Sequence, residues 1–164
     1  MAKELKTNVM RILDAAKIPY HPYFYENKDG KIDGVSVAQK LGQNVEQVYK
    51  TLVTRGAGSG YFVFVVPVAK ELNLKAAAKS VGEKSVEMIH VTEINKITGY
   101  IRGGCSPVGM KKQFPTVIDS SCGNIAAMCV SGGRIGTQVE VEPKALIELI
   151  GAKTADIAED AKPE

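Results

Sequence analysis

The segment Gly103-Gly104-Cys105-Ser106-Pro107 has the composition of a loop that could hold an anion. Adjacent glycines permit backbone angles that other residues avoid, and Pro107 fixes its own φ and biases Ser106 away from the helical region. A stiff, irregular loop of this kind leaves backbone N–H groups without helix or strand partners, and such groups bind an anion or a developing oxyanion. The simpler alternative, a turn between two strands, is the more frequent structure for such a segment taken alone.

Two further positions could belong to the same site. Lys50 opens an apolar strand directly after Val48-Tyr49, where it could present a positive charge to a phosphate or an ester oxygen. Ser131-Gly132-Gly133 repeats the combination of a hydroxyl and exposed backbone between two expected strands. Each feature also has an ordinary explanation. Lys50 could be a lysine that reaches water along its aliphatic chain, and Ser131-Gly132-Gly133 could be a hairpin turn. For either feature alone the ordinary explanation is favoured.

The remaining reactive side chains form no catalytic or metal-binding motif. His21 and His90 stand in no metal-ligand spacing with a cysteine. Cys105, Cys122 and Cys129 are odd in number and lack a C-x-x-C pair, so we expect free, small buried thiols rather than a disulfide framework or zinc ligands. A Ser–His–acid triad assembled in space stays open, but no nucleophile elbow, phosphate-binding P-loop or dinucleotide fingerprint is present. We expect no metal and no cofactor.

Composition is that of an ordinary globular protein. The chain has 164 residues, of which 45% are hydrophobic and 24% charged, and this length predicts one domain over residues 1–164. The net charge of +3 permits a nucleic-acid partner without requiring one. The longest apolar run, Tyr61–Ala69, is too short to cross a membrane, and the first residues lack the apolar core of a signal peptide. We therefore expect a cytoplasmic location and no membrane partner.

Many short elements are expected along the chain. Hydrophobic periodicity predicts helices over residues 7–16, 36–41, 44–48, 74–81, 93–98 and 143–150. Their expected N-caps are Thr7, Ser36, Asn44, Asn73 and Thr92, and Pro143 opens the last helix. Apolar runs predict strands over residues 20–25, 50–54, 61–66, 86–89, 116–119, 125–130 and 135–141. The polar residues from Asp156 on are expected to be frayed.

The arrangement of these elements indicates an α+β fold. Strands come in close pairs around turns, which favours antiparallel pairing, and helices do not alternate strictly with strands. Tyr61–Val66 is apolar without alternation, so this strand should be buried on both faces. The sheet is expected to be mixed, and it could close on itself.

Taken together, several segments resemble a known family. They are, in chain order, Val48–Leu52, Leu72–Lys75, Ala77–Lys79, Val86–Met88, Thr98–Tyr100 leading into Gly103–Pro107, Gly109–Lys112, Pro115–Asp119 and Val130–Gly133. In this order they resemble the YbaK/EbsC aminoacyl-tRNA deacylases, relatives of the editing domain of bacterial prolyl-tRNA synthetases, and within them the members that act on Cys-tRNA(Pro). The family signature corresponds to Lys50 and to the Gly-x-x-x-Pro element from Gly103 to Pro107, and the resemblance spans about Tyr20 to Asp156.

The resemblance implies a fold, an activity and partners. The fold would be a mixed, barrel-like β-sheet surrounded by helices. The activity would be hydrolysis of the ester that joins a wrong amino acid to the 3′ end of tRNA, with removal of cysteine from tRNA(Pro) beside prolyl-tRNA synthetase. Cys105, Met110 and the loop from Glu26 to Gly34 depart from the family pattern and could tune which amino acid is accepted.

The residues and the resemblance together define an expected site. Lys50 and Gly103 are the expected catalytic residues. The expected substrate-binding residues are Tyr20, Thr51, Gly104, Cys105, Ser106, Pro107, Ser131, Gly132 and Gly133. A one-residue change of strand register would exchange Tyr20 for His21 at the pocket, so that choice stays open.

The expected site suggests a mechanism of ester hydrolysis, and two other functions stay open. An aminoacyl ester is already activated, so stabilisation of the carbonyl oxygen would suffice, and the thiol of a cysteinyl substrate could attack its own carbonyl. With few aromatics and no long basic helix, the chain should contact only the acceptor end of tRNA, and no DNA partner is expected. A non-catalytic tRNA-end or nucleotide-binding module would show no turnover before or after Lys50→Ala. A hydrolase that used Cys105 would lose activity on Cys105→Ser, a loss that we do not expect.

Overall fold

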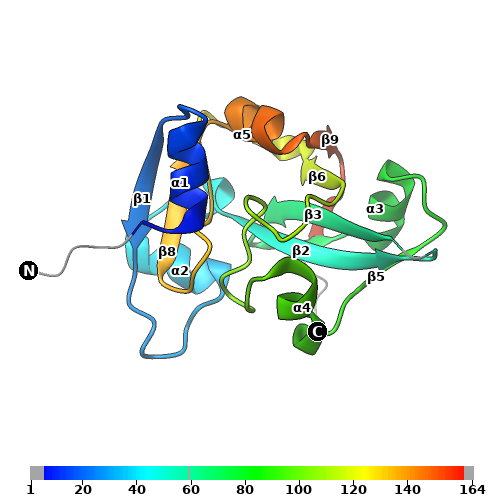
Figure 1. Ribbon diagram of the computed structural model, residues 1–164, viewed down its shortest axis with the longest axis horizontal. Coiled ribbons are helices and arrows are strands. Elements are labelled where there is room, and N and C mark those ends of the chain that lie inside the picture. The colour runs from blue at the N-terminus through cyan, green and yellow to red at the C-terminus, as the bar shows by residue number, and fades with distance from the viewer. Residues whose placement is uncertain (1–5, 59, 161–164) are drawn as a thin grey trace, which may run out of the picture.

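The computed structural model describes residues 6–58 and 60–160, and its strands form three sheets. The largest has the order β5-β2-β3-β6-β9, with β2 at Tyr49–Gly56, β3 at Tyr61–Pro67, β5 at Val86–Met88, β6 at Thr116–Asp119 and β9 at Lys153–Ala155. A second sheet has the order β1-β8-β7, formed by Tyr20–Phe24, Thr137–Val141 and Met128–Ser131. The third pairs β10, Ala158–Asp160, with β4, Lys70–Leu72. Figure 1 shows β1 and β8 at one end of the molecule and β5 at the other.

Strand β3 is the buried centre of the largest sheet. It runs antiparallel to β2 and parallel to β6. The side chains of Val63, Phe64, Val65 and Val66 are inaccessible to solvent, as the continuous apolar run predicts. Since successive residues of a strand point to opposite faces, Phe64 and Val66 join one hydrophobic cluster and Val65 joins another.

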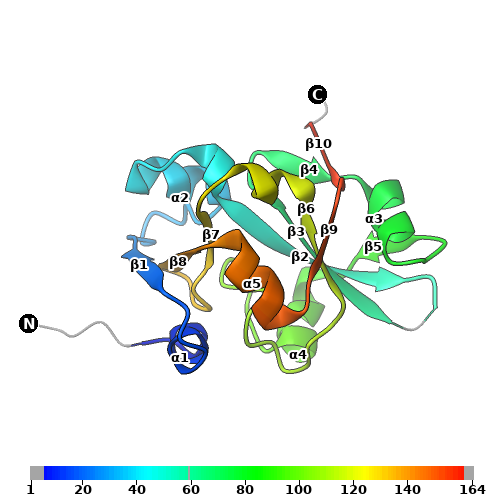
Figure 2. The same ribbon diagram turned by 90° about the horizontal axis from the view of Figure 1, so that it is seen from above.

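Five α-helices cover these sheets: α1 at Asn8–Ala15, α2 at Gly34–Leu41, α3 at Leu74–Ser80, α4 at Ile94–Thr98 and α5 at Pro143–Ile150. Short 3-10 turns lie at Val45–Gln47, Val91–Glu93 and Ser120–Asn124. α1 and α5 pack on the cluster that contains Val65, whereas α3 packs on the opposite one. Figures 1 and 2 place α1 and α2 at the end of the molecule that carries β1, and α3 at the other end. No helix in residues 6–58 and 60–160 is long and apolar enough to cross a membrane.

The expected N-caps are confirmed at three positions and wrong at two. The side chains of Thr7, Asn44 and Asn73 accept a backbone N–H at the start of their helices. Ser36 is not a cap, because Asp33 accepts the Ser36 amide at 3.1 Å and the helix begins two residues earlier, at Gly34. Thr92 is not a cap either, since a 3-10 turn that starts after His90 leads into α4.

The expectation of a frayed end from Asp156 on is wrong for residues 156–160, and residues 161–164 lie outside the described part of the chain. The side chain of Ile157 is inaccessible to solvent, and β10 pairs with β4. Asp119 holds this segment, since its Oδ1 accepts the amides of Ile157 and Ala158, each at 3.0 Å. Strands β4, β9 and β10 were not predicted, because each has only three residues and carries no continuous apolar run. The expected strand over residues 125–130 is also shorter and later, at Met128–Ser131.

The α+β class with a mixed sheet is confirmed, but the barrel-like closure is not. In the described part of the chain the three sheets stay separate, and the largest ends in the open edges of β5 and β9. An isolated bridge between Val48 and Cys129 brings the start of β2 beside β7. The two larger sheets therefore meet next to Lys50.

We expect Asp119→Ala to lower the free energy of unfolding by about 2–4 kcal/mol, because the carboxylate also accepts the amide of Ser121 at 3.2 Å and three donors would lose their acceptor. Chemical denaturation measures the change. Asp160→Ala is the matched control, since that exposed carboxylate pairs only with Lys70 among the described residues and should change stability little. Equal losses in the two variants would contradict the role given to Asp119.

Candidate functional site

A cavity of about 780 Å³ opens where the two larger sheets meet. Its walls come from the β1–α2 loop (residues 25–33), strand β2, the segment from β5 to α4, the glycine loop (Gly103–Pro107) and the β7–β8 hairpin. Of the residues predicted for the site, the cavity is lined by Lys50, Thr51, Gly103, Cys105 and Ser131. Widely separated parts of the chain thus converge on one space.

Lys50 supplies a cation whose charge is not neutralised by the protein. Its side chain is half-buried, and among residues 6–58 and 60–160 it has no hydrogen bond or ion pair. Burial lowers the pKa of Lys50 below its ordinary 10.5, and the charge of Glu71 opposes that shift only in part. Beside it, Thr51 Oγ1 is buried without a hydrogen-bond partner in the described chain. An anion bound at this cavity would pair with Lys50, and a bound hydroxyl or carbonyl group would satisfy Thr51 Oγ1.

The glycine loop presents free backbone donors at this cavity. Gly103 has φ +88°, a left-handed conformation that favours glycine. The Gly104 amide donates to the carbonyl of Ile101 at 2.9 Å, but within the described residues the amides of Gly103, Cys105 and Ser106 have no acceptor. Gly103 and Cys105 line the cavity. Their amides are therefore suited to an oxygen that carries or develops negative charge.

Three other residues predicted for the site belong to the glycine loop but do not line the cavity. Ser106 and Pro107 are buried, and Ser106 Oγ accepts the amide of Val108 at 3.3 Å. Gly104 lies against the β7–β8 hairpin, where an added Cβ would stand 3.1 Å from the backbone nitrogen of Ile135. A side chain at Gly104 would crowd the hairpin backbone, and none of these three residues lines the cavity.

The second glycine segment, Ser131-Gly132-Gly133, is a packed hairpin turn, as expected for such a segment taken alone. Gly132 donates to the Thr137 carbonyl at 3.1 Å, and Gly133 donates to Ser131 Oγ at 3.1 Å. A Cβ on Gly133, which has φ +95°, would stand 2.8 Å from Val9 Cγ2. The amides of this turn are occupied, and Ser131 alone of the three reaches the cavity wall.

Neither Tyr20 nor His21 lines the cavity. Tyr20 packs against the hydrophobic cluster beneath α1, where burial, followed by the nearby charge of Asp14, raises its pKa. Tyr25, which follows β1 and donates its amide to Gly136 O at 3.0 Å, lines the cavity instead. Pairing of β1 with β8 fixes this outcome, because it turns Tyr20 toward the core.

Sequence reasoning missed several polar residues of the cavity wall. Arg102 precedes Gly103 and adds a second cation, and the buried Gln138 accepts a hydrogen bond from Gln43 Nε2 at 2.5 Å. Asp33 adds a carboxylate whose pKa is lowered by hydrogen bonds from Ser36. The position of Arg102 beside the glycines is a signal that could have found it, whereas Gln138 becomes visible only through the β7–β8 pairing.

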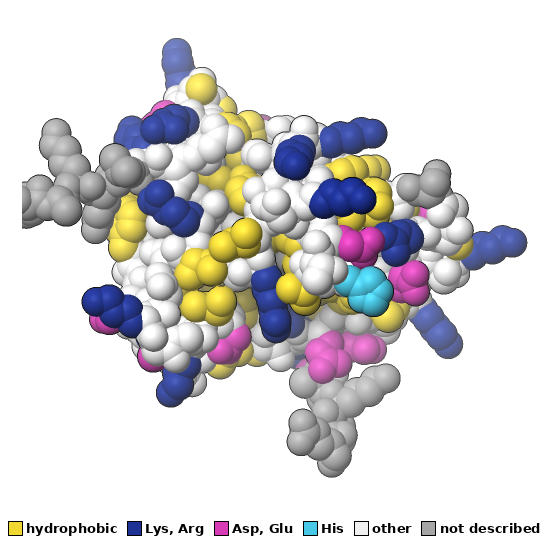
Figure 3. All heavy atoms as spheres, turned by 60° about the horizontal axis from the view of Figure 1, so that its bottom comes forward, with side chains coloured by type: hydrophobic (Ala, Val, Ile, Leu, Met, Phe, Trp, Pro, Cys, Tyr) yellow, Lys and Arg dark blue, Asp and Glu magenta, His cyan; other side chains and the backbone are white. Residues whose placement is uncertain are grey.

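The cavity mouth combines apolar and basic groups. Met88 and Val91 line it and are 45% and 55% exposed. The face shown in Figure 3 carries hydrophobic side chains interspersed with lysine and arginine side chains, and it also carries several acidic side chains. Apolar surface beside cations suits the unstacked end of a nucleic acid, which offers both bases and phosphates.

Cys105 is poorly suited to act as a nucleophile. It packs against the cluster of Val53, Ile89 and Met110, and burial raises the pKa of its thiol to about 11. The reactive species of cysteine is the thiolate, so Cys105 is almost fully protonated near neutral pH. Among the described residues no three His, Cys, Asp or Glu side chains are grouped so that they could hold a metal ion.

Comparisons with known proteins agree on one family. A family model for an aminoacyl-tRNA editing domain matches residues 33–149. A protein of Enterococcus faecalis, provisionally named Cys-tRNA(Pro)/Cys-tRNA(Cys) deacylase EbsC, is 43% identical over 152 residues, which are 93% of each chain. The solved structure of hypothetical protein APE2540 has a TM-score of 0.84 at 25% identity and covers 92% of this chain and 99% of its own. A structure provisionally described as a trans-editing enzyme for prolyl-tRNA synthetase has a TM-score of 0.78 at 25% identity, covering 95% and 99%.

We expect the Cys105 thiol in the native protein to react with iodoacetamide about 100-fold more slowly at pH 7.5 than an unperturbed thiol, because its pKa is about 11. Mass spectrometry of the alkylated peptides measures the rate. N-acetylcysteine and the protein unfolded in guanidinium chloride serve as references. A native rate equal to theirs would make Cys105 a nucleophile candidate again.

Proposed function

The chain belongs to the aminoacyl-tRNA editing domain family, and on this premise we propose that it hydrolyses the ester bond of mischarged aminoacyl-tRNA, with Cys-tRNA(Pro) as its substrate. One observation carries the proposal. In a single cavity, an unpaired cation from Lys50 faces the same space as the free amides of the glycine loop. The names of the Enterococcus faecalis relative and of the trans-editing structure support the same activity.

The reaction requires little more than charge stabilisation. An aminoacyl ester is an activated acyl group, so the main tasks are to hold it and to stabilise the negative charge that develops on the carbonyl oxygen. The amides of Gly103 and Cys105 are the donors that we assign to this oxygen. Lys50 anchors the terminal phosphate or sugar, or approaches the carbonyl itself, and Thr51 and Ser131 line the space for the substrate.

The nucleophile that we propose is the thiol of the substrate. Cys105 is held in its protonated form, so the protein offers no activated thiol at the cavity wall. A free cysteine thiol has a pKa of about 8.5, and the charge of Lys50 increases its thiolate fraction. The sulfur attacks the carbonyl carbon, the bond from that carbon to the 3′ oxygen breaks, and this oxygen takes up a proton. Water then opens the cyclic thioester. An alanyl ester has no such route, which gives a discrimination that pocket size alone does not provide.

The tRNA contacts that we propose are confined to the acceptor end. Arg102 and the apolar rim at Met88 and Val91 lie at the cavity mouth, where the last unpaired nucleotides would enter. Residues 1–164 would act as a single trans-editing domain in the cytoplasm, where tRNA is charged. Choice of the tRNA body would come from prolyl-tRNA synthetase as a partner.

We expect the purified protein to hydrolyse Cys-tRNA(Pro) in the presence of EDTA, at least tenfold faster than Ala-tRNA(Pro) or Ser-tRNA(Pro). Lys50→Ala should lower the rate by about 100-fold or more, because the cavity loses its unpaired cation. Release of labelled amino acid from tRNA measures the rate. Lys144→Ala, at an exposed lysine on α5, is the matched control and should keep full activity.

Equal rates on Cys-tRNA(Pro) and Ala-tRNA(Pro) would show that turnover does not depend on the thiol of the substrate. Absence of turnover on all three tRNAs, together with tight binding that Lys50→Ala weakens, would identify a non-catalytic module that binds tRNA ends.

The rate of deacylation should fall at alkaline pH with a midpoint below 10.5, because burial lowers the pKa of Lys50 and the cation is lost as pH rises through that value. Rapid-quench assays corrected for spontaneous ester hydrolysis give the midpoint. Lys50→Arg keeps its charge throughout this range, so its residual activity should show no such decline. A midpoint at or above 10.5 in the wild type would mean that Lys50 is not the titrating group.

A further inference from the structure

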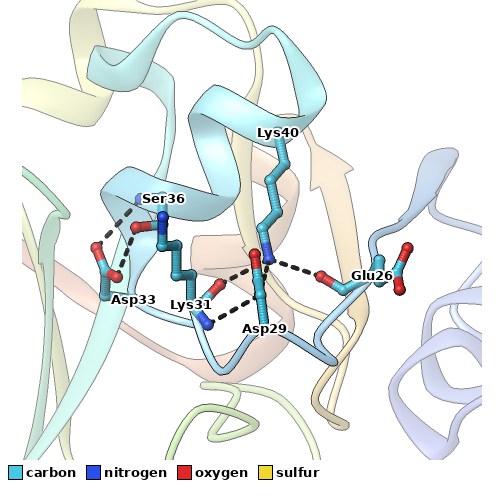
Figure 4. Close-up of polar contacts among 6 residues, drawn as sticks. All are labelled: Glu26, Asp29, Lys31, Asp33, Ser36 and Lys40. Atoms are coloured by element: carbon cyan, nitrogen blue, oxygen red, sulfur yellow. Dashed lines mark hydrogen bonds and ion pairs between the residues drawn. The ribbon is translucent and has the colours of Figure 1, made fainter.

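Building on the proposed function, we propose that the β1–α2 loop sets the size of the acyl group that the cavity accepts, with Ile32 as the specificity-determining residue and Lys40 as the positioning residue that holds the loop. Gly30, Ile32 and Asp33 of this loop line the cavity. Lys40 does not line it and reaches the loop from helix α2 (Figure 4).

Lys40 ties the loop to helix α2 through all three of its donors (Figure 4). Its Nζ donates to the carbonyl of Glu26 at 2.7 Å, to Asp29 Oδ1 at 2.8 Å and to the carbonyl of Lys31 at 2.9 Å. The Lys40 side chain is only 22% exposed. An ammonium group has three hydrogens, so these contacts use its full donor capacity and fix both sides of the loop to one point.

The loop is fixed at two further places. Asp33 caps α2 by accepting the amide of Ser36 at 3.1 Å, and its second oxygen accepts the Ser36 hydroxyl at 2.7 Å (Figure 4). The first residue of α2, Gly34, lies so near Val68 that an added Cβ would stand 2.1 Å from Val68 Cγ1. The backbone on either side of Ile32 is therefore held in place.

Ile32 lies directly against Gly103, whose amide is one of the proposed oxyanion donors. A Cβ on Gly103 would stand 2.7 Å from Ile32 Cδ1, so the end of this side chain fills the space next to Gly103. An acyl carbonyl held by the Gly103 and Cys105 amides would bring its own side chain to this wall. A rigid aliphatic wall excludes larger groups by steric overlap, whereas it discriminates weakly against smaller ones.

The test compares two thiol substrates of different size. tRNA(Pro) is charged with cysteine or with β,β-dimethylcysteine, which keeps the thiol and adds two methyl groups. Ile32→Ala should raise the ratio of kcat/KM for dimethylcysteinyl-tRNA to that for cysteinyl-tRNA by about tenfold. Ile32→Val, which removes only the Cδ1 that faces Gly103, should raise it by about threefold without a folding penalty. Ile147→Ala on α5, at a residue of the same type that packs on the core and does not line the cavity, should leave it unchanged.

Lys40→Met tests the positioning role. It should raise KM for Cys-tRNA(Pro) about five- to tenfold more than it lowers kcat, and it should raise the dimethylcysteine ratio as Ile32→Val does. Hydrogen exchange of residues 25–33 should accelerate at least tenfold, with partial recovery in Lys40→Arg. Lys6→Met removes an exposed ion pair with Asp14 and should change none of these.

The outcomes separate the inference from the function that it rests on. If the wild type hydrolyses Cys-tRNA(Pro) but both Ile32 variants keep the wild-type ratio, the specificity role is overturned while the deacylase remains. If exchange of the loop is unchanged in Lys40→Met, the positioning role is overturned whatever the turnover. If the wild type hydrolyses neither substrate, the proposed function fails, and the acyl role of the loop fails with it.

Discussion

Burial of β3 is the constraint on which the site depends. A strand that is covered on both faces cannot slip by one residue without turning its side chains into the wrong clusters, so its register with each neighbour is fixed. Lys50 lies opposite Val66 and Thr51 opposite Val65 in that register. The position of one cation and one hydroxyl at the cavity is thus decided by apolar packing that neither residue takes part in.

The same features explain which parts of the molecule were predictable. Tyr61–Pro67 and Pro143–Ile150 carry strong local signals, a long apolar run and a proline at the first helical turn, and both elements form close to where they were expected. The expected cap Ser36 is wrong because α2 begins earlier. Asp33 accepts the Ser36 amide, and Gly34 is held close against Val68, a tertiary contact that no local pattern reveals. Strands β9 and β10 form because Asp119 and the edges of β6 and β4 are available to them, which no local pattern reveals.

For the site, the sequence indicates the backbone donors and the cation, but it does not indicate the other residues of the cavity wall. Lys50, Thr51, Gly103, Cys105 and Ser131 carry distinctive residue types at distinctive positions, and all of them line the cavity. Ile32, Tyr25 and Gln138 are of ordinary type and become wall residues only through the pairing of β1 with β8 and the course of the loop that follows β1. The glycines divide in the same way. Gly103 borders the cavity and also leaves no room for a Cβ beside Ile32, whereas Gly104 and Gly133 do not border it and pack closely against neighbouring parts of the chain.

The strand pairings also bear on how the protein folds. β1 pairs with β8, β4 with β10 and β6 with β9, so many native contacts join residues that are far apart along the chain. In such a topology the entropy cost of closing large loops comes before the stabilising contacts can form. Folding is therefore expected to be slow compared with that of a helical bundle of similar size. The cavity draws its walls from several of these distant segments. The complete site therefore forms only when the strand pairings that bring these segments together have formed.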